Sequence, residues 1–229
     1  LHTHANEWFP RQARLQLLDR ARNPADLRSA ARDLRSLFDS EKNPVHQLRA
    51  LWSLQALGAT DEAFLITLLR HPDEHLRTWA VRLMTDDWAL DKVVEVASSD
   101  PVRRITSSPG LARLLAQQAR TETSGLVRLA LASALQRLSV EERIPLAAAL
   151  VAHREDAADH NLPALIWYGL IPVADSFPGE LPKLANVCEL PLTRRLIARR
   201  LAEDLERQPA PVNSLILLAS TKGEGFQSD

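Results

Sequence analysis

The sequence is poor in the residues that sheets, disulfides and thiolate sites require. Among its 229 residues there are one Cys and seven Gly, and aromatics make up 5%. Glycine at about half its usual frequency is too scarce for the many tight turns of a propeller or barrel. A single Cys excludes an internal disulfide and a thiolate metal site. No apolar run approaches the roughly 20 residues that a membrane span needs, so we expect no transmembrane helix.

The chain also lacks a charge excess of either sign. Lysine and arginine number 28 against 29 acidic residues, which gives a formal net charge of −1. Binding to nucleic-acid phosphates is favoured by a positive excess, so this balance argues against a nucleic-acid partner. The chain begins at Leu1 with neither Met nor a signal-peptide pattern. We therefore expect a segment of a longer, multidomain protein.

What is abundant is leucine and alanine at helical spacing, interrupted by helix start and stop signals. A capping residue stands directly before proline at four places, which predicts an N-cap followed by the first helical residue. These pairs are Asn23-Pro24, Asn43-Pro44, Asp100-Pro101 and Ser108-Pro109. The signals and the apolar periodicity together predict about twelve helices of roughly ten to seventeen residues, joined by short loops.

Three further residues predict where individual helices begin or end. Ser139 with Glu142 has the pattern of a capping box. Asn161 is expected to cap the helix that begins just before Pro163. Gly58 is expected to end the helix that starts at Pro44, because glycine adopts the left-handed conformation that terminates many helices.

Five segments of the chain resemble one another, each with an Arg inside a helical pattern of small and large apolar residues. The alanines Ala13, Ala50 and Ala80 are spaced by 37 and then 30 residues, close to the period of roughly 40 in two-helix repeats. The spacing then lengthens, which predicts an inserted turn near 100–109. We therefore predict an all-α fold, a HEAT-like α-solenoid formed by residues 1–229 as a single domain with no sheet.

The recurrent arginines are candidate interaction residues on the concave face of such a solenoid. They are Arg49, Arg77, Arg128 and Arg195. The alternative is that each arginine only links repeats, by pairing with an acid of the adjacent repeat or by capping its carbonyl groups.

The densest cluster of chemically versatile residues lies between positions 153 and 161. Its candidate metal ligands or catalytic groups are His153, Glu155, Asp156, Asp159 and His160. Imidazole and carboxylate together suit a divalent ion, but the cluster has no His-Glu-x-x-His spacing. Capping and loop-ordering hydrogen bonds are the favoured interpretation, and a metal site is the alternative.

The remaining singular residues are predicted to have structural roles. The five tryptophans lie at helical positions typical of core anchors, although Trp167 and Tyr168 are candidates for a surface groove. His2 and His4 are interpreted as a frayed chain end. Cys188 stands among apolar residues and is predicted to be a buried, inert thiol.

Several strings are similar to one known family. The segments 6–14, 126–138, 153–169 and 192–201 resemble the helical-repeat region of large bacterial PVC-type haem-binding proteins, also described as membrane-bound dehydrogenases. The resemblance covers nearly the whole chain and is most specific over 126–169. It implies a dehydrogenase-like propeller before this segment, a cytochrome c domain after it, and a periplasmic or cell-surface location.

The chain itself contains neither a propeller nor a Cys-x-x-Cys-His haem-attachment motif. We therefore predict a non-catalytic scaffold without a cofactor, whose partners are protein domains of the same parent chain or another protein. Two alternatives remain. HEAT-like DNA glycosylases act on alkylated bases through a cationic groove with aromatics and a carboxylate. A glycan or small ligand could instead bind around His160, Trp167 and Tyr168.

Overall fold

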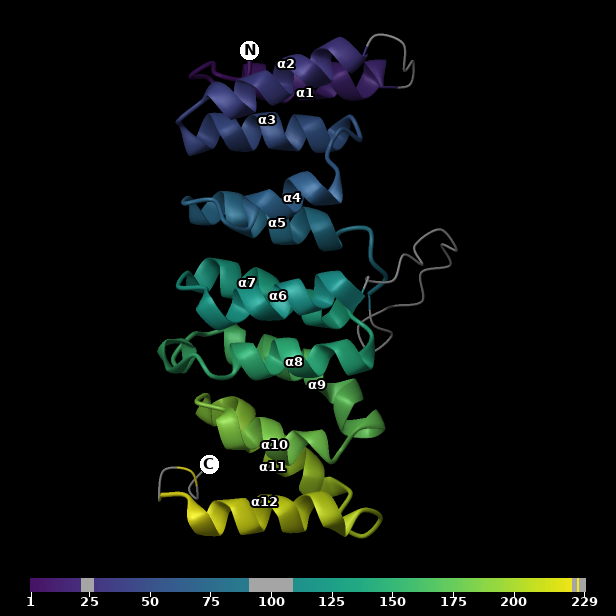
Figure 1. The fold of residues 1–229 in the computed structure, drawn as a ribbon, viewed down its shortest axis with the longest axis vertical. Coiled ribbons are helices and arrows are strands. Elements are labelled where there is room, and N and C mark those ends of the chain that lie inside the picture. The colour runs from purple at the N-terminus through teal and green to yellow at the C-terminus, as the bar shows by residue number, and fades with distance from the viewer. Residues whose placement is uncertain (22–26, 91–108, 224–225, 227–229) are drawn as a thin grey trace. The chain divides into compact units, whose positions relative to one another are not determined.

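The computed structural model describes residues 1–21, 27–90, 109–223 and 226 (Figure 1). Within these residues it contains twelve α-helices, two short 3-10 helices and no strand, which confirms the all-α prediction. The predicted helix starts at Pro24 and Pro101 and the inserted turn before Pro109 lie outside the described residues.

The chain divides into two compact units, residues 1–84 and 85–229. The first unit contains α1 (Trp8–Arg20), α2 (Leu27–Ser40), α3 (Pro44–Ala56), α4 (Glu62–Leu68) and nearly all of α5 (Glu74–Thr85). Helix α3 packs against both α1 and α2. Phe38 of α2 meets Phe64 of α4 with ring centroids 5.2 Å apart, and Trp52 of α3 meets Trp79 of α5 at 5.0 Å. Next-but-one helices therefore lie in contact.

The second unit repeats this next-but-one arrangement over more helices. Its α-helices are α6 (Pro109–Thr121), α7 (Gly125–Ala134), α8 (Val140–Leu150), α9 (Leu162–Ser176), α10 (Glu180–Val187), α11 (Pro191–Glu203) and α12 (Pro209–Thr221). The 3-10 helices η2 (Leu135–Arg137) and η3 (Arg154–Asp156) follow α7 and α8. One series of contacts joins α6, α8, α10 and α12, and another joins α7, α9 and α11. This is a layered helical array.

Local signals in the sequence explain several helix boundaries. Helix α3 begins at Pro44 as predicted, and the Asn43 side chain accepts the backbone N–H of Val45 at 3.0 Å. Gly58 has φ +64°, and its N–H donates to the carbonyl of Gln55. This is the geometry of a Schellman motif, so Gly58 ends the helix as predicted.

The capping box at α8 differs from the prediction. The helix begins directly after Ser139, but the Ser139 side chain makes no capping hydrogen bond to the backbone. Its hydroxyl instead donates to the Glu142 carboxylate at 2.9 Å. The position of the helix start was thus predictable, and the bonds at that start were not.

Helix lengths and the placement of tryptophans also depart from expectation. Helices α4 and α10 have only 7 and 8 residues, fewer than predicted. Trp88 is buried as expected, whereas Trp8 is 58% exposed, so the preferred assignment of the tryptophans to the core is wrong for Trp8. Cys188 is buried, and burial raises the pKa of its thiol to about 11. The thiol is therefore protonated at neutral pH, as an inert cysteine should be.

Candidate functional site

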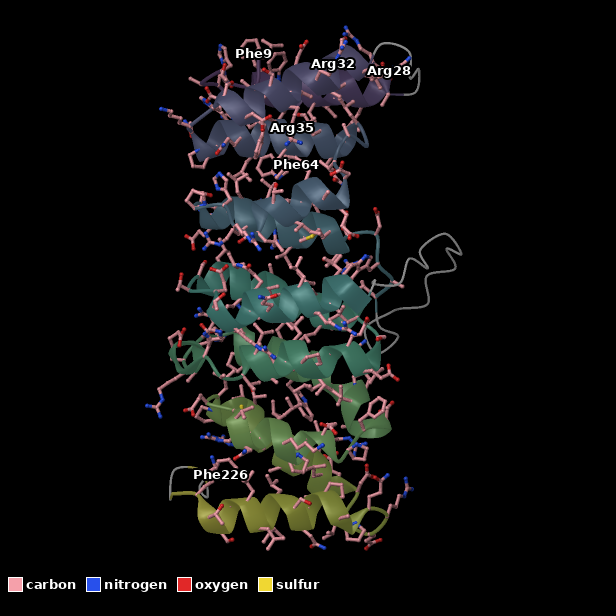
Figure 2. All side chains as sticks on the ribbon, viewed as in Figure 1. Phe9, Arg28, Arg32, Arg35, Phe64 and Phe226 are labelled. Carbon is pink, nitrogen blue, oxygen red and sulfur yellow. The ribbon has the colours of Figure 1, made fainter. Side chains whose placement is uncertain are left out.

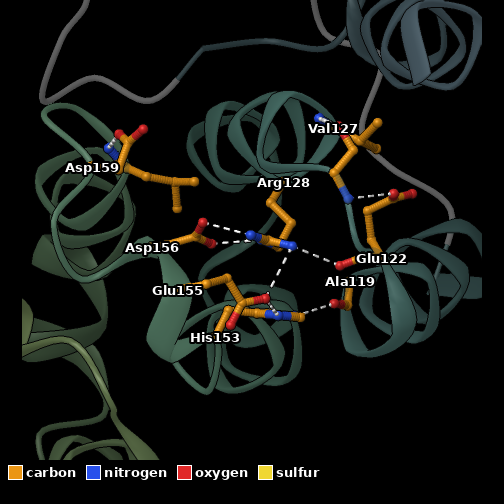
Figure 3. Close-up of polar contacts among 10 residues, drawn as sticks. Ala119, Glu122, Val127, Arg128, His153, Glu155, Asp156 and Asp159 are labelled. Atoms are coloured by element: carbon orange, nitrogen blue, oxygen red, sulfur yellow. Dashed lines mark hydrogen bonds and ion pairs between the residues drawn. The ribbon is translucent and has the colours of Figure 1, made fainter.

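The polar cluster predicted around residues 153–160 centres on a residue from outside it, Arg128 of α7 (Figure 3). The Arg128 side chain is 2% exposed, and its Nε donates to Asp156 Oδ2 at 2.5 Å. Its Nη2 donates to Asp156 Oδ1 at 2.6 Å, and its Nη1 to the carbonyl of Glu122 at 2.8 Å. Hydrogen bonding to Asp156 raises the pKa of Arg128, so this buried pair is ionic and bidentate.

His153 and Glu155 extend the same network toward solvent (Figure 3). His153 Nδ1 lies 3.0 Å from Glu155 Oε1, and its Nε2 lies 2.7 Å from the carbonyl oxygen of Ala119. Glu155 also pairs with Arg128 at 3.3 Å. Its own backbone N–H and the His153 ring lower the pKa of Glu155. Both ring nitrogens of His153 thus face protein oxygens, which leaves neither nitrogen open to a metal ion.

Asp159 and His160 are not part of this network. Asp159 Oδ1 accepts the backbone N–H groups of Asn161 at 2.8 Å and Leu162 at 2.7 Å. The predicted cap, Asn161, makes no side-chain capping bond, so that prediction is wrong and Asp159 has this role. His160 is exposed. Among the described residues no group of three or more His, Cys, Asp or Glu is placed to hold a metal ion.

Replacing Asp159 with Ala should destabilise the start of α9 by about 1 kcal/mol, the usual cost of losing such a cap. The backbone N–H groups of Leu162 and Asn161 lower the pKa of Asp159. Its stabilising effect is therefore complete above the unfolded pKa, about 3.9, and is lost as pH falls through the lower folded value. Urea titrations between pH 2 and 6 should show this loss in wild type.

Asp159→Asn is the matched control, because Asn retains the accepting oxygen but does not titrate. We expect it to preserve most of the stability at pH 6 and to flatten the acid-side dependence. An alanine variant as stable as wild type at pH 6 would contradict the assignment of Asp159 as the cap.

The recurrent arginines share one structural role. Arg77, Arg128 and Arg194 are each the fourth residue of their helix. Each donates from Nη1 to the carbonyl of the residue six positions earlier, at 2.8, 2.8 and 2.6 Å. The predicted member of the fifth segment, Arg195, is exposed, so the register there is wrong by one residue and Arg194 occupies the position.

Arg49 of α3 has a comparable role, because it binds backbone carbonyl groups near the start of the chain. It is buried, and its Nη1 donates to the carbonyl groups of His2 and His4, both at 3.0 Å. Its Nη2 pairs with Glu7. His2 is not frayed, since it is buried against Ser53 Oγ at 2.7 Å. Burial, with the nearby Arg charges, lowers the pKa of His2 to about 4.

The predicted surface pair, Trp167 and Tyr168, lies on α9. Tyr168 is 51% exposed, and Trp167 is partly buried. The neighbouring Gly169 lies against Leu135, where an added Cβ would come within 2.5 Å of the Leu135 Cβ. Neither aromatic residue lines the groove described next.

An open groove crosses α1, α3 and α5 in the first unit. Its volume is about 420 Å³, within the range of ligand-binding clefts. The lining residues are Arg14, Trp52, Gln55, Ala56, Trp79 and Leu83. The groove is therefore apolar and aromatic, with a guanidinium at one side.

A row of cation–π and edge-to-face aromatic contacts runs along the groove lining and continues past it to Arg82. The Arg14 guanidinium lies 5.2 Å from the Trp52 ring, and the two indoles are 5.0 Å apart at 70°. Arg82 lies 5.4 Å from the Trp79 ring. The order Arg14, Trp52, Trp79, Arg82 defines what we call the Arg-Trp ladder. It places a cation at each end of two partly exposed indoles, an arrangement favoured by cation–π attraction.

Two hydrogen-bond donors of the ladder lack acceptors among the described residues. They are Trp52 Nε1 and Arg14 Nε, both buried. Burial also lowers the pKa of Arg14. Buried donors without acceptors cost free energy. The sequence pattern does not predict this site, because a Trp at a helical position is most often a core anchor. The available signal was the recurrence of Trp within three residues after Arg49 and Arg77.

A second surface feature of the first unit is a row of arginines along α2. Arg28, Arg32 and Arg35 are exposed and spaced by four and three residues, so they share one face of the helix (Figure 2). Arg35 lies 3.8 Å from the Phe64 ring centroid and pairs with Asp39 at 3.2 Å. An exposed pair of this kind contributes little stability.

Comparison of this chain with known proteins identifies no relative. In the part of the chain that the structure describes, none of the helices combines the length and the apolar character needed to cross a bilayer. No family model, curated protein or solved structure matches this chain.

Proposed function

We propose that this chain is a non-catalytic, HEAT-like helical-repeat segment that holds part of another protein in the groove of α1, α3 and α5. The contacts between next-but-one helices support a solenoid, because stacked repeats bury their apolar faces only against neighbours. The arginine that returns at the fourth position of α5, α7 and α11 supports a repeated unit.

The observation that carries the function is the groove itself. Its volume of about 420 Å³ and its two partly exposed indoles offer apolar area to a partner. Tryptophan and arginine are the residues that most often dominate binding energy at protein interfaces. By contrast, Arg49 and Arg128 are buried and are occupied by loop carbonyls and carboxylates, so they are unsuited to a partner surface.

A library of random 12-residue peptides displayed on phage tests this proposal. Enriched peptides should bind the wild-type chain at least tenfold more tightly than Ala56→Trp, which fills the groove without creating a cavity. Trp79→Ala should weaken binding similarly, with circular dichroism confirming that both variants are folded. Failure to enrich any peptide, or enriched peptides that bind both variants as tightly as they bind wild type, would refute the groove as an interaction site.

The DNA glycosylase is a second candidate, because the Arg-Trp ladder also has the aromatic and cationic groups that hold an extruded base. Two observations disfavour it. The six groove-lining residues include no carboxylate, and the formal net charge is −1. Excision of a methylated base from a duplex by wild type, abolished in Trp79→Ala, would reverse this preference.

The resemblance to PVC-type haem-binding proteins supports a setting for this scaffold. We propose that it links a dehydrogenase-like propeller to a cytochrome c domain in an exported parent protein. The flanking reading frame tests this setting. Propeller strands before the segment and Cys-x-x-Cys-His after it would support the proposal, whereas unrelated domains on both sides would contradict it.

A further inference from the structure

We infer that the occupant of the groove is an acidic peptide segment, which places a bulky apolar side chain on Trp52 and Trp79 and a carboxylate at Arg14. This inference rests on the proposed function and specifies the chemistry of the partner. It is carried by the apolar lining of the groove, by the acceptor that Arg14 Nε lacks, and by the charges around it.

The indoles determine the apolar part of the ligand. Trp52 and Trp79 stand at 70° to each other with centroids 5.0 Å apart, and both are only partly buried. Ala56 and Leu83 complete the apolar wall. A Leu, Ile, Phe or Trp side chain entering here would remove apolar surface from water on both partners, which is the main driving force of such contacts.

Arg14 determines the acidic group of the ligand. The guanidinium carries five N–H donors, its buried Nε has no acceptor among the described residues, and the group lies over the Trp52 ring. The Glu7 carboxylate, whose charge Arg14 senses, is already paired with Arg49. A carboxylate from a partner would therefore supply the acceptor that the chain does not. A partly desolvated guanidinium gains more from such a pair than a fully solvated one.

The surrounding charges favour an anionic partner over a cationic one. Residues 1–84 contain eleven Arg and one Lys against ten acidic residues, although the whole chain is slightly negative. Arg14 is the cation that lines the groove, while Arg82 lies outside the lining, against the Trp79 ring. A basic peptide would meet repulsion from Arg14.

The side chain of Gln55 favours a peptide as the ligand that carries the apolar side chain and the carboxylate. Its Oε1 accepts the Thr60 hydroxyl, which orients the amide so that its NH₂ group remains the donor. Gln55 lines the same groove as the two indoles and Arg14. A peptide carbonyl is the natural acceptor for an amide donor at this place. Phosphates of single-stranded nucleic acid could also pair with Arg14, and the experiment separates the two.

The test is an array of 9-residue peptide pools with a fixed apolar centre (Leu, Ile, Phe or Trp). The residues on both sides of the centre are acidic, amide or basic in three parallel pools. Wild type should bind the acidic pool at least tenfold more tightly than the amide pool and should bind the basic pool least. Arg14→Gln should abolish the preference for acidic over amide pools while retaining binding of the amide pool.

Arg11→Gln is the matched control, because Arg11 is an exposed arginine of the same helix that does not line the groove. It should keep the acidic preference within about threefold. In spectra of ¹⁵N-labelled wild type, the acidic pool should shift the indole N–H resonance that disappears in Trp52→Phe.

The outcomes separate this inference from the proposed function. Equal binding of acidic and amide pools, or an acidic preference that survives Arg14→Gln, would overturn the acidic occupant and leave the groove as an interaction site. Binding to none of the pools, with no peptide enriched from the random library, would overturn both. Displacement of the acidic pool by micromolar oligo-dT, itself bound more tightly, would assign the groove to nucleic acid.

Discussion

Replacing Asp156 with Asn is expected to lower the free energy of unfolding by about 3–5 kcal/mol, the usual loss when one partner of a buried ion pair is removed. Arg128 and Asp156 have side chains only 2% and 6% exposed. Asparagine keeps the volume of Asp156 but leaves the Arg128 charge without its bidentate partner. Urea titration followed by circular dichroism measures the loss.

Glu155→Gln is the control, because it removes a carboxylate from the adjacent residue. Glu155 is 58% exposed and lies 3.3 Å from Arg128, so we expect a loss below about 1 kcal/mol. A double variant, Arg128→Met with Asp156→Asn, should cost clearly less than the sum of the single changes, because it removes the stranded charge. A loss for Asp156→Asn no larger than that for Glu155→Gln would show that the pair contributes little.

Replacing Gly169 with Ala should destabilise the second unit by about 2 kcal/mol. The new Cβ would lie 2.5 Å from the Leu135 Cβ, an atom that can retreat only if its backbone moves. Overpacking of this kind costs about 1–3 kcal/mol, which exceeds the gain of up to about 1 kcal/mol from the better helix propensity of alanine. A shift of α9 would also strain the hydrogen bond from Arg143 to the Gly169 carbonyl, 3.1 Å long.

Thermal and urea unfolding of two further variants completes this test. Gly110→Ala in α6 meets no atom within 4 Å, so its stability should be unchanged or raised by up to about 1 kcal/mol. Combining Gly169→Ala with Leu135→Gly should cost less than the two losses added, because glycine removes the Leu135 Cβ and so relieves the clash. If the stability losses of the two single variants add without any relief, close contact with Leu135 is not the cause of the destabilisation by Gly169→Ala.

Much of the fold could be predicted because its signals are local. Asn43 and Gly58 act on backbone groups within five residues of themselves, and apolar periodicity identifies a helix from a dozen residues. The capping interactions at Ser139 and Asn161 were predicted less well, since several neighbouring side chains compete for the same N–H groups. Asp159 reaches the start of α9 from two residues further away than expected.

The candidate sites could not be predicted in the same way, because their partners are distant in sequence. Arg128 finds Asp156 twenty-eight residues later, and Arg49 holds the backbone of His2 and His4 more than forty residues earlier. The local sequence does not distinguish a buried, paired arginine from an arginine at the surface, because either kind lies on a helix between apolar residues. The choice between Arg194 and Arg195 likewise depends on which one faces the preceding loop.

The sequence by itself determined the helical class, the approximate number of helices and the recurrence of an Arg-bearing unit. These follow from propensity, capping and periodicity, which act within a few residues. Only the tertiary structure decided that Trp52 and Trp79 face an open groove with Arg14. It also decided that carboxylates of the polar cluster at 153–160 pair with Arg128. Burial and pairing of a side chain depend on which helices become neighbours, and helices far apart in the chain meet only when their apolar faces pack.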